Sequence, residues 1–169
     1  CQTALHGRGD RMPTIDEYAA FINHLRTKDE QEAKDILDEI YTVRSPWRAE
    51  WLDAEFSVGS GGVLMRYHAF TDSGIEQRHA DLQGILKEDK TPGIDLDSWL
   101  GDNEYGLPKQ DISDGQLWYW HPRNNRVARF NVDSVWAFLS CVRYPSFRYV
   151  RLGVRAVRRA DAKNSGGRK

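Results

Sequence analysis

The sequence predicts an α+β fold, because helical periodicity dominates its first part and strand periodicity its last part. Apolar residues recur at helical spacing within 14–25 and again within 30–43. Short alternating stretches follow at 63–70, 116–122 and 126–132. We therefore expect helices to come first along the chain, followed by short strands and long loops.

The beginning of the first helix is marked by a capping box, in which Thr14 precedes Glu17 by three residues. The Thr14 side chain can accept a hydrogen bond from the Glu17 amide while Glu17 reaches back. A third, short helix is expected in "SPWRAEWLD" at 45–53, because Trp47 and Trp51 stand four residues apart. Such apolar stripes are typical of a buried core.

Turn chemistry fills most of segment 71–115, in which we expect only one short helix at 75–86. Long loops inside a compact domain are often its working parts. Residues 1–13 lack periodicity and are expected to form a tail, and 159–169 a disordered one. The sequence thus predicts a single domain over 14–158.

Composition argues against disorder and against a membrane span, because 29% of the residues are charged and 11% are aromatic. The two cysteines, Cys1 and Cys141, are too few for a disulfide framework, and the apolar neighbours of Cys141 predict a buried thiol. Because the chain starts at Cys1 rather than Met, we expect an upstream segment to be missing. The histidines are scattered and no nucleotide, metal or nucleophile motif occurs, so we expect no cofactor, no metal and no enzymatic activity.

Charge is distributed unevenly along the chain. Acidic residues outnumber Lys and Arg by eleven to five within 14–56, whereas 121–169 contains twelve Lys or Arg and two acids. This asymmetry indicates either an acidic partner or a match between the two halves of the protein. Arg148, Arg155 and Arg158 are candidates for pairing with the acidic N-terminal helices.

The segment 136–157, "WAFLSCVRYPSFRYVRLGVRAV", has apolar or aromatic residues on both alternating faces. Ala137, Leu139 and Cys141 point one way and form a regular core layer. The other face is chemically miscellaneous; it comprises Trp136, Phe138, Ser140, Val142 and Tyr144. This second face is either a displayed binding surface or the far side of a strand buried on both sides.

The framework "RFN-x-x-S-x-W-A-x-L-x-C-x-R-x-PS-x-R-x-V-x-LGVRAVR" resembles the variable region of variable proteins from diversity-generating retroelements. In that family a reverse transcriptase copies a template with errors at adenines, so that AAC codons for Asn become codons for many residues. The residues found at the x positions are compatible with such a template. The resemblance implies that nine positions are variable and bind the ligand: Asp133, Val135, Phe138, Ser140, Val142, Tyr144, Phe147, Tyr149 and Arg151.

The resemblance implies a C-type lectin-like fold, with two N-terminal helices packed on a small twisted antiparallel β core with long loops. It implies that a variable region at about 131–157 displays diversified side chains that bind a macromolecular target on a host or environmental surface. Family members occur in phages, other viruses and cells, and usually act on a virion or cell surface. Calcium-dependent sugar binding is not implied, because EPN and WND motifs are absent, and oxidase chemistry of related folds needs paired cysteines.

Nucleic-acid binding is the alternative function. The C-terminal basic excess is interleaved with Tyr, Phe and Trp, so it could form a stacking platform with phosphate contacts. Strong salt dependence of binding would favour this alternative.

Overall fold

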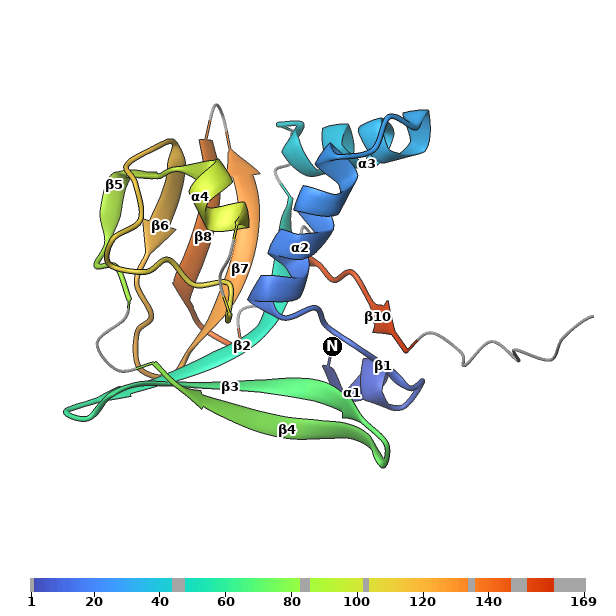
Figure 1. The fold of residues 1–169 in the computed structure, drawn as a ribbon. Helices are drawn as coiled ribbons and strands as arrows, with labels where there is room; N and C mark the ends of the chain where they lie inside the picture. The colour runs from blue at the N-terminus through green and yellow to red at the C-terminus, as the bar shows by residue number, and fades with distance from the viewer. Residues whose placement is uncertain are drawn as a thin grey trace, which may run out of the picture.

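A computed structural model describes residues 2–43, 48–82, 86–101, 104–133, 136–146 and 152–159 (Figure 1). None of the helices in these ranges is long and apolar enough to cross a membrane. The elements are α1 (Gln2–His6), β1 (Asp10–Arg11), α2 (Ile15–Arg26), α3 (Gln31–Tyr41), β2 (Ala49–Gly59), β3 (Gly62–Thr71), β4 (Gly74–Asp81), β5 (Lys90–Ile94), α4 (Leu96–Leu100), β6 (Leu117–Trp120), β7 (Arg126–Asp133), β8 (Trp136–Arg143), β9 (Leu152–Gly153) and β10 (Val157–Arg158).

The described strands form one large sheet in the order β4-β3-β2-β7-β8-β6-β5, with β9 beside β2, and a separate pair of β1 and β10. The sheet is mixed, because β6 runs parallel to β8 and β9 parallel to β2. The α+β class is therefore confirmed, whereas the expected small antiparallel core is a larger mixed sheet. The helices α2 and α4 lie on one face of this sheet (Figure 1).

Local signals in the sequence identify α2, α3, β3, β6, β7 and β8 correctly. Thr14 Oγ1 accepts from the Glu17 backbone N–H at 3.4 Å, and the Glu17 carboxylate accepts from the Thr14 N–H at 3.0 Å. The capping box is thus present. Glu17 also binds the Arg11 guanidinium. Burial raises the pKa of the Glu17 carboxyl, but hydrogen bonds from Arg11 and from the Thr14 backbone N–H outweigh it and hold this pKa below its usual value.

Three sequence predictions are wrong. Strand β2 replaces the helix expected at 45–53, of which 45–47 lies outside the described residues, because the residues of β2 pair with β3 and β7. Strand β4 replaces most of the helix expected at 75–86, of which 83–85 lies outside the described residues, because the whole of β4 pairs with residues 64–71 of β3. Within the expected tail 1–13, α1 and β1 form, and Asp10 pairs with Arg158 from the other end of the chain. In each case pairing with another strand overrides the local pattern; the partner is distant for β1 and for the β2–β7 pair, and adjacent in sequence for β4.

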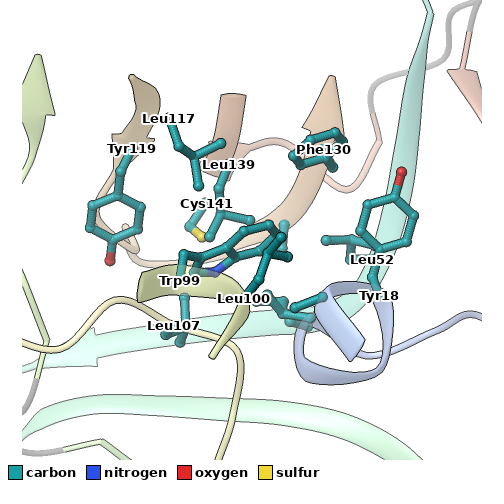
Figure 2. Packing of buried hydrophobic residues seen from close by; sticks show 14 of the residues in the cluster. Tyr18, Leu52, Trp99, Leu100, Leu107, Leu117, Tyr119, Phe130, Leu139 and Cys141 are labelled. Carbon is teal, nitrogen blue, oxygen red and sulfur yellow. The ribbon is translucent and has the colours of Figure 1, made fainter. Parts of the chain in front are cut away.

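The core lies between the helical layer and one face of the sheet (Figure 2). Phe130 is at its centre: its ring stacks on Trp99 with centroids 6.0 Å apart, and Tyr18 lies 5.2 Å from it. Leu139 and Cys141 from β8 reach the same layer and are fully buried. The buried, free Cys141 confirms the sequence prediction, and burial raises the pKa of its thiol.

Acids from the first half of the protein neutralise three arginines near its C-terminal end. Arg155 binds Glu50 at 2.8 Å, and Arg158 binds the buried carboxylate of Asp10 at 2.7 Å. Arg159 contacts Asp72 at 3.2 Å. The uneven charge distribution therefore reflects, in part, a match between the two halves, although the acids come from β1, β2 and a turn rather than from the helices. Arg148 lies outside the described residues.

Replacing Thr14 with alanine should lower the free energy of unfolding by about 1 kcal/mol, because one amide at the start of α2 then lacks its acceptor. Urea denaturation measures this difference. Thr42→Ala is the matched control, since Thr42 ends α3 through its backbone N–H, which donates to Asp38 O at 2.7 Å. Equal losses in the two variants would contradict the capping role of the Thr14 side chain.

Candidate functional site

Successive side chains of strand β8 point to opposite faces of the sheet. Leu139 is fully buried against the helical layer, whereas its neighbour Phe138 is partly exposed. On the adjacent strand β7, Phe130 pairs with Leu139 and Asn131 pairs with Phe138. Since paired residues share a face, Asn131 and Phe138 lie on the side of the sheet away from the core. We call this side of β6, β7 and β8 the outer face.

Three aromatic rings gather on the outer face. Trp118 of β6 pairs with Phe138 in the parallel ladder, and their ring centroids are 5.2 Å apart. Trp120 stacks on Phe138 at 5.3 Å with an angle of 11° between the rings. All three side chains are neither fully buried nor fully exposed. Such a rigid aromatic cluster at a surface provides contact area at low entropic cost.

A β-bulge changes the direction of the end of β8. Arg129 pairs with Ser140, but two residues earlier on β7 Val127 pairs with Arg143. The extra residue of β8 places Arg143 on the same face as Ser140. Tyr144, which follows the strand, instead lies with its ring 3.6 Å from the Arg126 guanidinium and is 57% exposed. The expected single alternating face over 136–144 is therefore wrong beyond Ser140.

The predicted variable positions have different environments. Phe138 and Val142 are half-buried, and Tyr144 is exposed. Ser140 is fully buried, so the expectation that its side chain is displayed is not met in the described structure. Asp133 ends β7, and its side chain is not among those described. The remaining positions lie outside the described residues: Val135, Phe147, Tyr149 and Arg151.

Beside the outer face, a polar cluster lines a pocket of about 450 Å³. The buried carboxylate of Asp53 accepts from the His68 backbone N–H at 3.0 Å and from Gln2 Nε2 at 2.9 Å. The His6 and His68 rings are 4.8 Å apart, and burial together with the His68 charge lowers the pKa of His6. The part of the chain that the structure describes contains no group of three or more His, Cys, Asp or Glu arranged to hold a metal ion.

Sequence reasoning did not single out Trp118, Trp120, Arg129 and Arg143 as site residues. The signal for the tryptophans is present in "LWYW", where Leu117 and Tyr119 are buried and the alternate residues, Trp118 and Trp120, are only partly buried. The alternation of "RVARFNV" likewise places the side chains of Arg129 and Phe130 on opposite faces of the strand. The grouping of His6 with His68 has no local signal, because it depends on α1 contacting β3.

Comparisons with protein-family models, with curated proteins and with solved structures find no match to this chain.

Proposed function

We propose that this protein is a non-enzymatic, ligand-binding display protein, in which diversified side chains of the C-terminal variable region bind a macromolecular target. The observation that carries the proposal is that framework residues and expected variable residues of β8 lie on opposite faces of the sheet. The framework residues Leu139 and Cys141 fill the core, whereas Phe138, a position expected to vary, joins Trp118 and Trp120 on the outer face. Aromatic clusters of this kind are typical of binding hot spots.

The C-type lectin-like fold belongs to the same proposal. It is supported by two helices, α2 and α3, that precede a twisted sheet, and by chain ends that pair with each other through β1 and β10. Long connections accompany these elements, notably between α4 and β6. The resemblance of segment 131–157 to a retroelement variable region suggests this fold.

The decisive experiment is to sequence the DNA that flanks the gene. We expect a near-copy of the codons for residues 131–157 in which AAC stands at the variable positions, next to a reverse transcriptase gene. Such a copy identifies the binding positions one by one. Complete flanking sequence with neither the copy nor the reverse transcriptase would contradict the proposal.

A stability measurement tests whether the expected variable positions contribute less to folding than the framework positions in the core. Returning Phe138, Val142 and Tyr144 together to Asn, the expected template residue, should cost about 2 kcal/mol or less, because these side chains retain contact with water. The control Leu139→Asn places a polar amide in the core and should cost about 3 kcal/mol or more. Urea denaturation measures both. A triple variant that fails to fold would show that the variable positions are structural.

A further inference from the structure

The outer face also carries positive charge close to its aromatic cluster. Arg129 pairs with Ser140. Val127, which lies two residues before Arg129 and therefore on the same face, pairs with Arg143, so Arg129 and Arg143 share this face. Arg129 is only 5% exposed, whereas Arg143 is half-buried and reaches water. Two guanidinium groups at neighbouring positions repel each other, and burial strengthens this repulsion.

The titration of these groups reflects this arrangement. Burial and the nearby charge of Arg143 lower the pKa of Arg129 to about 10, and burial lowers the pKa of Arg143. Both groups stay protonated at neutral pH. An anion placed beside Arg143 would offset the repulsion between the two guanidinium groups and replace part of the hydration that Arg143 loses on burial.

Three buried polar atoms on the outer face lack a hydrogen-bond partner among the described residues. Arg143 Nε is buried and donates to no acceptor among the described residues, and no ion pair in the described part of the chain involves its guanidinium. Ser140, the cross-strand partner of Arg129, is fully buried, and its hydroxyl has no hydrogen-bond partner there either. Asn131 Oδ1, next to Phe138, is a third buried polar atom without a partner. Buried polar groups normally find a partner, so this set indicates a missing ligand.

We infer that the outer face contains an oxyanion subsite built from Arg143 and Ser140, beside Arg129, whose occupant is a carboxylate of a protein ligand. This inference rests on the proposed display function and names the ligand chemistry. Arg143, which is half-buried, would pair with the ligand carboxylate from the solvent side of the subsite. Ser140, which is buried, would donate its hydroxyl hydrogen to that carboxylate from the side nearer the sheet. Trp118, Phe138 and Trp120 would cover the apolar neighbours of that carboxylate.

The surrounding charges favour one carboxylate over a nucleic-acid strand. A bound strand needs basic groups spaced along its phosphates. Arg123 is already engaged by Asp89 at 2.5 Å, and the arginines of the C-terminal end, Arg155, Arg158 and Arg159, have carboxylate partners as well. Among the described residues, the positive charge of the outer face is therefore concentrated at Arg129 and Arg143 and does not extend along a track.

The test follows the arginine Nε–Hε NMR signals while the full chain is titrated with sodium acetate or sodium sulfate, with sodium chloride holding the ionic strength constant. We expect the Arg143 and Arg129 signals to shift and saturate. Arg143→Gln should weaken the response by about tenfold, as followed at Arg129. The control Arg123→Gln, which changes an arginine that already has a carboxylate partner, should bind as the original protein does.

Two results would overturn the inference. The first is a response that does not saturate, or that is the same in the Arg143→Gln variant. The second is tighter, strongly salt-dependent binding of an oligothymidylate than of a poly-glutamate peptide of equal charge, which would replace the carboxylate by a nucleic-acid phosphate. Neither depends on the flanking DNA, so the display function and the oxyanion subsite can fail separately.

Discussion

Replacing Phe130 with alanine is expected to lower the free energy of unfolding by about 3 to 5 kcal/mol. The ring of Phe130 contacts three aromatic neighbours, Tyr18, Tyr41 and Trp99, and only 2% of the residue is exposed. Its removal leaves a cavity that stiff aromatic side chains cannot refill. Urea denaturation followed by circular dichroism measures the loss.

Phe138 offers the matched control, because it is the same residue type on the adjacent strand but on the other face. Phe138→Ala removes the contacts with Trp118 and Trp120 from a site that already touches water, and should cost about 1 kcal/mol. The two-face description of the sheet predicts this difference. Comparable losses in the two variants would mean that the outer face is a second core.

Gly106→Ala should have an effect of similar size, for a different reason. Gly106 has a φ of +70°, and a Cβ there would lie 2.3 Å from the backbone nitrogen of Asp16. Its carbonyl also accepts a hydrogen bond from Trp99 Nε1 at 2.7 Å, so moving the loop disturbs the core. Left-handed strain and overpacking together should cost about 3 kcal/mol or more.

The control Gly9→Ala separates the two causes. Gly9 has nearly the same φ, +75°, but nothing lies within 4 Å of the added Cβ. Its loss should be about 1 to 2 kcal/mol, from backbone strain alone. The difference between the variants then measures the close approach of the loop to the start of α2. A loss at Gly106 no larger than at Gly9 would disprove that approach.

The parts of the fold that the sequence predicts correctly are those whose cause is local. Thr14 and Glu17 are three residues apart, so their reciprocal hydrogen bonds are visible in the sequence, and α2 begins where they predict. The alternation around Leu139 and Cys141 also predicts a core face, because a strand places every second side chain on one side. Such signals need no knowledge of distant segments.

The incorrect predictions depend on strand partners that the local pattern does not reveal. The spacing of Trp47 and Trp51 fits a helix, but Trp51 pairs with Arg129 of strand β7, which is far away in the sequence. The bulge that places Arg143 beside Ser140 arises from a shift in register between two strands, and no residue in "SCVR" marks it. For the candidate site, the sequence therefore predicts Phe138 but neither the tryptophans that surround it nor the paired arginines.

The pairing of β1 with β10 also determines how this protein can be attached to a larger body. Asp10 lies opposite Arg158, so the chain enters and leaves the domain at one corner. In Figure 1 this corner is on the other side of the molecule from β5, β6 and β8. Under the display function proposed above, a larger body joined at this corner would leave the aromatic cluster on the opposite side, accessible to a target.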